Sequence, residues 1–257
     1  ASAGRPRPPR RLVSFDGGLE SLPRALAAGL GPALKCEAPV TGLHRTDLGW
    51  RVTFDHASGL SPRVHRAVVY AGSAPRFPEV TIDEQRVAGL GALATMPHTS
   101  VAVVGLGFHQ GQLGSRLTGW GALVSAAERS SLLGVVFSSA VFPRRAPAGH
   151  VLVTALLGGA RDQRTGALPS ADLVGMAVGA LTPLLRLTGE PVFQHVSMLH
   201  LTMPQYDLQH GHRLAVVDEL ERNADGLVLA GCWRRGTGLP TAIREGVAAA
   251  RRIQGAF

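Results

Sequence analysis

The sequence predicts an α+β fold, with a helix and short strands at the start of the chain, a sheet-based module in the middle, and a strand, turn and helix at the end. Strand-like segments dominate the centre of the chain, and the chain closes with a strand, a glycine-bearing turn and a helix. Its 257 residues, 45% hydrophobic and 17% charged, suffice for one large domain or two modest ones. A disordered chain is therefore excluded.

The first 80 residues predict one helix and several short strands. Leucines at steps of three and four over residues 19–30, ended by Gly29 and Gly31, indicate an amphipathic helix. A hairpin turn is expected near Asp47 and Gly49. Residues 12–15 form a short apolar run, and strands are expected at 34–36, 40–43, 50–54 and 67–70.

The composition shifts after Pro75 and Pro78, and the following segments predict a second, sheet-based module. Residues 168–187 predict a helix. Strands are expected at 99–106, 121–125, 132–142 and 151–157.

The closing segment carries the most specific local pattern. A buried strand over 226–231 runs through a glycine turn into a helix from Pro240 to about Gln254. A proline in the first helical turn loses no hydrogen bond, and the amides at the positive end of a helix can hold an electron-rich oxygen. An ordinary tight connection between strand and helix is an equally open interpretation.

Charge and composition exclude several classes of function. The net charge of +8 suggests a polyanionic partner, but Lys35 is the single lysine and aromatic residues make up only 5% of the chain. Nucleic-acid binding is therefore not expected. A charge-free run such as 173–185 is shorter than the roughly 20 residues of a membrane-spanning helix.

The termini and cysteines indicate a compartment. The start of the chain, 1–11, is rich in arginine and proline and has no apolar core of a secretion signal, so the chain is expected to begin inside a longer protein. Cys36 and Cys232 show no CxxC spacing. A reducing cytoplasm is the expected location.

A glycine-rich run, Gly105-x-Gly107-x-x-x-Gly111 with Glu128 downstream, resembles a dinucleotide-binding loop. Such a loop must be followed by a helix whose N-terminus faces the pyrophosphate. Further glycines after the run would break that helix. We therefore predict glycines in a bent strand or hairpin.

No catalytic or metal-ligating residue is predicted. A metal site needs three or four ligands with supporting partners, so the clustered histidines are interpreted as surface or structural groups: His195, His200, His210 and His212. No nucleophile motif is present. The acidic cluster is interpreted as a solvated charge run: Asp218, Glu219 and Glu221.

Five separated blocks together resemble oxygen-dependent protoporphyrinogen oxidase, of the flavin amine-oxidase-like superfamily. The blocks are Leu12–Leu19, Gly134–Ser139 with Phe142-Pro143, Leu156–Gly159, Met203–Tyr206 and Leu227–Ile243. They agree in order and spacing over nearly the whole chain. The resemblance covers the C-terminal portion of the family, and the family's N-terminal dinucleotide-binding motif is missing, so a truncated form or one half of a split protein is expected.

The resemblance implies FAD as cofactor and the oxidation of protoporphyrinogen IX to protoporphyrin IX by oxygen, with hydrogen peroxide as by-product, in haem biosynthesis. It implies a partial FAD-linked amine oxidase-like fold. Its expected limits are 1–80 and 213–257 for the two parts of the FAD domain and 81–212 for the substrate-binding domain.

Site residues follow from matched positions. The cofactor-binding positions are Val40, Ala71, Gly231, Trp233, Gly236, Thr237, Gly238, Leu239 and Ile243. Cys232 and Thr237 depart from the residues usual in the family. The tetrapyrrole substrate is expected at Leu123, Val136 and Leu156, for which plain strand core is the alternative interpretation.

Other functions and partners stay open at this point. The substrate alternatives are coproporphyrinogen III, an amine or a carotenoid precursor. A non-catalytic half that assembles with an N-terminal half chain, or a homodimer, is a further alternative. The family also leaves open a peripheral location at the inner face of the cell membrane.

Overall fold

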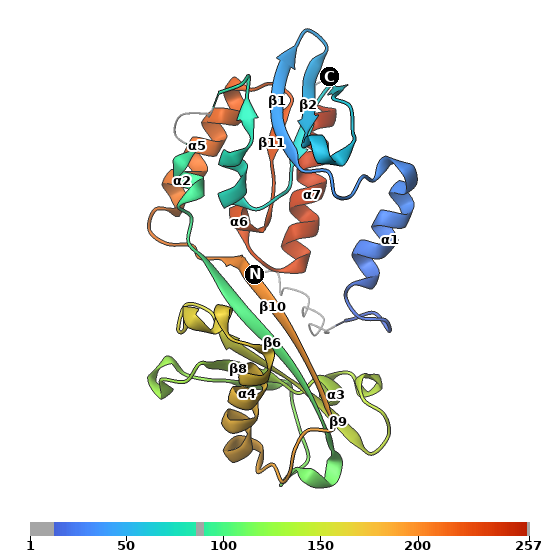
Figure 1. The fold of residues 1–257 in the computed structure, drawn as a ribbon, viewed down its shortest axis with the longest axis vertical. Coiled ribbons are helices and arrows are strands. Elements are labelled where there is room, and N and C mark those ends of the chain that lie inside the picture. Colours follow the sequence, from blue (N-terminus) through green and yellow to red (C-terminus); the bar gives the residue numbers. More distant parts are fainter. Residues whose placement is uncertain (1–12, 86–89, 256–257) are drawn as a thin grey trace, which may run out of the picture. The chain divides into compact units, whose positions relative to one another are not determined.

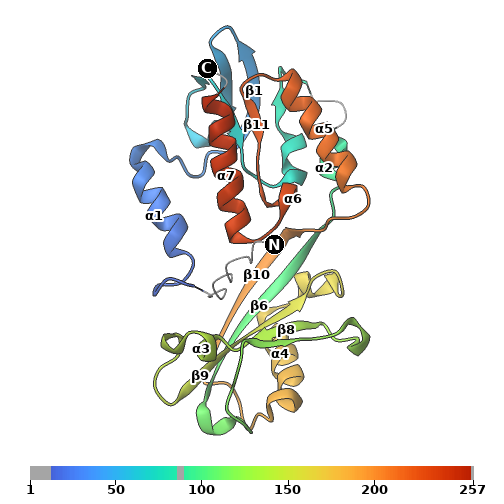
Figure 2. The ribbon, with the colours of Figure 1, turned by 180° about the vertical axis from the view of Figure 1, so that it is seen from behind.

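The computed structural model describes residues 13–85 and 90–255, in two compact units (Figures 1 and 2). The described residues up to Ala38 form the first unit, and those from Pro39 onward form the second. Within the described ranges, no helix combines the length and the apolar character that crossing a bilayer requires.

The first unit contains helix α1, Ser21–Leu30, which confirms the helix predicted from the leucine spacing. None of its residues is buried. The strand predicted at 34–36 is wrong, because a 3-10 turn with a proline at its start, Gly31–Ala33, leads into a stretch that joins no ladder. Of the apolar run at 12–15, Leu12 lies outside the described residues, and residues 13–15 join no strand or helix.

The second unit begins with a four-stranded sheet in the order β3-β2-β1-β5. Its strands are β1 (Val40–Thr46), β2 (Gly49–Phe54), β3 (Arg63–His65) and β5 (Thr81–Ile82). β1 and β2 form the predicted hairpin. Gly49 has a φ of +120°, and a Cβ there would lie 2.3 Å from the His65 carbonyl oxygen, so the turn requires glycine. Leu43, Trp50 and Val52 are buried in the core beneath the hairpin.

Two segments far apart in the sequence meet as a parallel pair, β4 (Val68–Tyr70) and β11 (Leu227–Leu229). Both strands were predicted. Leu227 and Leu229 are buried in the core that also contains the hairpin residues. The surrounding helices are α2 (Gly91–Ala94), α5 (His210–Asn223), α6 (Cys232–Arg235) and α7 (Leu239–Gln254). Helix α7 confirms the predicted closing helix.

A second sheet has five antiparallel strands in the order β10-β6-β9-β8-β7. Helix α4 (Ser170–Leu185) covers one of its faces through Leu173, Ala177 and Leu181, and confirms the predicted helix. The strands are β6 (His98–His109), β7 (Gly121–Leu123), β8 (Leu132–Val136), β9 (His150–Gly158) and β10 (Phe193–Pro204). Figure 1 shows β6 and β10 running side by side as two long strands.

Two predictions for this sheet have opposite outcomes. Gly105 and Gly107 lie inside β6, which confirms a strand in place of a dinucleotide loop. The strand predicted at 132–142 is wrong beyond Val136, because helix α3 (Ser138–Val141) follows. There the Ser139 Oγ accepts a 2.9 Å hydrogen bond from the Leu152 N–H, so a side chain takes the place of the ladder.

Candidate functional site

The closing turn, residues 231–238, contains most of the residues predicted to hold the cofactor. It consists of Gly231, the one-turn helix α6 and the link from Gly236 to Gly238 that starts α7. The φ angles of Gly231 and Gly236 are +149° and +138°, in a region that essentially only glycine adopts. A Cβ on Gly231 would lie 2.5 Å from the Trp233 Nε1. The backbone of this turn therefore requires its glycines.

A cavity of about 610 Å³ lies beside the turn, lined by parts of segments 71–76, 94–98, 200–202 and 232–233. It brings together two predicted cofactor residues, Ala71 and Trp233. The buried Trp233 donates from its Nε1 to the Gly72 carbonyl oxygen at 3.3 Å, which ties the turn to the segment after β4. Gly231 adjoins the same place, since a Cβ there would lie 3.5 Å from that oxygen.

The chemistry of the cavity fits a flat heteroaromatic ring such as a flavin. Apolar groups of Met96, Leu201 and Trp233 line it, and its size is typical of small-molecule sites. Its polar side chains are few: Ser73, Arg76, His98, His200 and Thr202. The His98 Nδ1 lies 2.9 Å from the Met96 carbonyl oxygen. Because a carbonyl only accepts, Nδ1 is the donor in this contact.

The other predicted cofactor residues do not line this cavity: Val40, Gly236, Thr237, Gly238, Leu239 and Ile243. Val40 begins β1 and is 38% exposed. Leu239, Ile243 and Val247 are also exposed and, at steps of four, form an apolar stripe along α7. The structure thus brings Ala71, Gly231 and Trp233 together, and leaves the remaining positions on the link and on α7.

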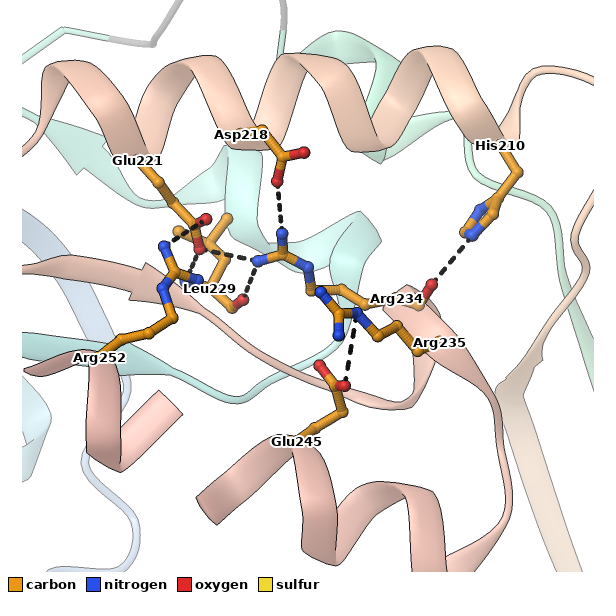
Figure 3. Close-up of polar contacts among 8 residues, drawn as sticks. All are labelled: His210, Asp218, Glu221, Leu229, Arg234, Arg235, Glu245 and Arg252. Atoms are coloured by element: carbon orange, nitrogen blue, oxygen red, sulfur yellow. Dashed lines mark hydrogen bonds and ion pairs between the residues drawn. The ribbon is translucent and has the colours of Figure 1, made fainter. Parts of the chain in front are cut away.

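A network of ion pairs around the buried Arg234 and Glu221 joins the turn to α5, β11 and α7, and sequence reasoning missed it (Figure 3). The Arg234 guanidinium, 8% exposed, donates to the Glu221 Oε1 at 2.8 Å, to the Asp218 Oδ1 at 2.6 Å and to the Leu229 carbonyl oxygen at 2.6 Å. The Glu221 side chain is 4% exposed and also accepts from the Leu229 N–H and from Arg252. The sequence did contain one indication of this network. Asp218 and Glu221 are three residues apart, so on a helix they lie on the same face and can contact one partner.

The prediction of a solvated acidic run is therefore wrong for Glu221, although Asp218 is 59% exposed. Glu221 lies on the face of α5 that is turned toward β11 and α6. Burial works to raise the pKa of its carboxyl. The hydrogen bonds from Arg252 and the Leu229 N–H, with the charge of Arg234, outweigh burial and hold this pKa below its ordinary value.

A second set of contacts holds the backbone of α6. The Tyr206 hydroxyl donates to the Cys232 carbonyl oxygen, and the His210 Nε2 lies 3.2 Å from the Arg234 carbonyl oxygen. The rings of Tyr206 and His210 stack with centroids 4.5 Å apart. His210 is thus a structural group, as interpreted from the sequence. In the described part of the chain, no three His, Cys, Asp or Glu side chains gather as a metal site requires.

The three predicted substrate residues lie on one face of the five-stranded sheet. Leu123 pairs with Gly134, Gly134 pairs with Leu156, and Val136 is the next residue but one after Gly134 in β8. Directly paired residues, and residues two apart in a strand, point to the same face. Helix α4 packs on the opposite face, through residues such as Val153 and Ala155.

This face is not plain strand core. Leu123 is 92% exposed and Val136 is 41% exposed. A Cβ on Gly134 would lie 3.1 Å from the Leu123 Cδ2, so glycine lets that leucine lie across β8. The three residues share an open apolar surface, which we call the open sheet face.

Comparison with known proteins agrees with this architecture. Residues 5–254 match the family profile described as flavin containing amine oxidoreductase. A protoporphyrinogen oxidase of Bos taurus is 30% identical over 94% of this chain and 51% of its own length. A coproporphyrinogen III oxidase of Bacillus subtilis is 29% identical over 77% of this chain and 40% of its own length.

Solved structures show the same fold. A crystal structure from Exiguobacterium sp. 255-15, described as a candidate protoporphyrinogen oxidase, superposes with a TM-score of 0.78 at 24% identity, over 95% of this chain and 52% of that one. The chain thus spans about half the length of the relatives it matches, or less. A family profile that covers nearly the whole chain assigns the family, and the chain belongs to the flavin containing amine oxidoreductases, with FAD as the predicted cofactor of the family.

Proposed function

We propose that the chain forms the substrate sheet and the ring-side part of the flavin site of a porphyrinogen oxidase. The reaction is the oxidation of protoporphyrinogen IX to protoporphyrin IX, with oxygen as acceptor and hydrogen peroxide as by-product. The observation that supports it best is the open sheet face, where Leu123, Val136 and Leu156 meet. The proposed limits are 1–80 and 213–257 for the FAD-binding parts and 81–212 for the substrate-binding part.

The open sheet face suits a flat, apolar macrocycle. A tetrapyrrole placed on Leu123, Val136 and Leu156 would lose its hydration shell against hydrocarbon, which is the main driving force for such binding. Gly134 carries no side chain, so Leu123 can lie across β8 and extend the hydrocarbon surface from β7 over that strand. These residues bind and orient the ring and exclude water.

Ala71, Gly231 and Trp233 would hold the flavin at the cavity beside the closing turn. A bound flavin supplies the electron-accepting chemistry, so the protein needs little help from titratable side chains. A site in which apolar contacts dominate is consistent with a protein that positions the ring while the flavin accepts the electrons.

Porphyrin titration of the purified chain tests the proposal. Protoporphyrin IX, the oxidised product, serves as the probe through its fluorescence. Leu123→Asp and Val136→Asp should each weaken binding about tenfold or more, because a charge replaces hydrocarbon that the bound porphyrin would cover. Leu48→Asp is the matched control, since Leu48 is 77% exposed in the β1–β2 turn. Equal binding by all three variants would contradict a substrate role for the open sheet face.

Coproporphyrinogen III is a second candidate substrate, favoured by the similarity to the Bacillus subtilis coproporphyrinogen III oxidase. The two porphyrin classes differ in the number of their carboxylate groups. The same titration with coproporphyrin III decides between them. The preferred ring is the porphyrin that the wild-type chain binds more tightly and whose binding Leu123→Asp weakens.

A further inference from the structure

Helix α6 is too short to hold its own conformation. It has four residues, and a single helical turn is unfavourable on its own because nucleation fixes several residues for one hydrogen bond. Gly231 and Gly236 flank it on both sides, and glycine loses the most backbone freedom on folding. Groups outside the turn must therefore fix its shape.

Those groups come from α5 and the segment just before it (Figure 3). Tyr206 and His210 contact the carbonyl oxygens of Cys232 and Arg234. Asp218 and Glu221, on the same helix as His210, accept from the Arg234 side chain. One helix thus holds both the backbone and a side chain of α6.

The Arg234 contacts specify a geometry. Its guanidinium reaches three acceptors at once: Asp218, Glu221 and the Leu229 carbonyl oxygen. A guanidinium is planar and its N–H donors point in fixed directions, so it can reach all three acceptors at once. A lysine ammonium does not have this geometry. A buried ion pair is weak evidence for stability, because desolvation offsets much of the attraction. A role in fixing conformation accounts better for its burial.

We propose that Arg234 is a positioning residue, which, through Asp218 and Glu221 of α5, sets the closing turn in the conformation that places Gly231 and Trp233 at the flavin ring. The inference rests on the flavin role of that turn given under the proposed function. Arg235, its neighbour, is 72% exposed and reaches Glu245 only at 3.6 Å. It provides a matched control on the same helix.

Hydrogen–deuterium exchange of the full chain, read by mass spectrometry, tests the positioning role. Arg234→Lys keeps the positive charge but loses the planar set of N–H donors. Glu221→Gln keeps the side-chain shape but loses the negative charge. In both variants the peptide covering 230–238 should exchange about tenfold faster than in wild type, which corresponds to the loss of about one charged hydrogen bond. In Arg235→Lys this peptide should be unchanged, and in all variants peptides of β6 and β9 should stay within about twofold of wild type.

Two results would overturn the proposal: Arg234→Lys exchanging like Arg235→Lys, or an equal acceleration of all peptides. If Arg234→Lys and Glu221→Gln do not fold, Asp218→Asn takes their place. It removes only the contact to the 59% exposed Asp218 and should accelerate the same peptide to a smaller degree. An Asp218→Asn peptide that exchanges at the wild-type rate would then overturn the role.

FAD titration of the same variants, followed by quenching of flavin fluorescence, separates this proposal from the one it rests on. We expect Arg234→Lys to bind FAD about tenfold more weakly than Arg235→Lys. A wild-type chain without any FAD binding would count against the proposed flavin site. Equal FAD affinities of Arg234→Lys and Arg235→Lys, beside a wild type that binds, would overturn the positioning role alone.

Discussion

At the scale of single residues, two glycines and one carboxylate define the closing turn. Gly231 and Gly236 adopt backbone angles that other residues avoid. Glu221 accepts hydrogen bonds from β11, α6 and α7 with its two oxygens. The sequence identified the glycines because glycines that recur in a turn indicate backbone angles, or a close approach, that other residues do not allow. It did not identify Glu221, because a carboxylate in a charged run has the same appearance whether it is solvated or buried.

Gly231→Ala should destabilise the chain by about 1 to 3 kcal/mol, because the backbone angle is strained for alanine and its Cβ would meet the Trp233 ring. Urea unfolding measures this change. Gly246→Ala, in the middle of α7 with open space around it, is the control and should stabilise the chain by roughly 0.5 to 1 kcal/mol. Changes of the same sign in both variants would contradict the assigned backbone strain.

The lowered pKa of Glu221 predicts a specific loss of stability in acid. The folded state binds this proton less readily than the unfolded chain does. The contribution of Glu221 is therefore complete above the ordinary pKa of a glutamate, about 4.5, and is lost as the pH falls through the lowered value. The free energy of unfolding, measured from pH 7 to pH 3, should fall less steeply in Glu221→Gln than in wild type. Identical slopes would contradict the assignment.

At the scale of secondary structure, the sequence predicted elements with clean periodicity and missed β10 and α5, where a bulge or inward-facing charged residues interrupt the pattern. β10 was missed because its alternation breaks at a bulge between Leu199 and Met203, where Leu201 has a φ of +45°. Helix α5 was missed because Arg213 and Glu221 take inward positions that a helical pattern reserves for apolar residues. Arg213 is satisfied there by Asp207 and the Ala92 carbonyl oxygen.

Helix α4 illustrates the opposite case, in which periodicity alone gave the buried face. Leu181→Ala should lower the free energy of unfolding by about 2 to 5 kcal/mol, because it leaves a cavity between α4 and the sheet. Leu184→Ala, on the same helix but 49% exposed, should change it by about 0.5 kcal/mol or less. Urea unfolding of both variants checks which face packs on the sheet, and equal losses would contradict the packing described.

At the scale of the whole molecule, the site depends on contacts that only the fold creates. The substrate residues were placed from the family resemblance, but their shared face follows from the register of β7, β8 and β9. The cavity joins Ala71 to Trp233 across a large separation in sequence. Such long-range contacts cannot be read from local patterns. The domain limits at residues 80 and 212 stay a prediction.

The chain by itself should retain little FAD through purification. It spans about half the length of its relatives, and only three of its predicted cofactor residues meet at or beside the cavity next to the turn. The visible spectrum of the purified chain, and the flavin released on denaturation, measure this retention. A stoichiometric yellow protein would contradict the prediction, and would show that the ring-side contacts are sufficient for tight binding.

The contacts of Leu229 have a further consequence, for self-association. A strand at the border of a sheet presents N–H and C=O groups that can recruit a strand from another molecule. β11 has β4 on one side, and on its other side the Glu221 carboxylate and the Arg234 guanidinium occupy the Leu229 N–H and C=O. Two charged side chains thus occupy the outward backbone groups of Leu229, and a strand from another molecule would have to displace them before it could pair with this residue.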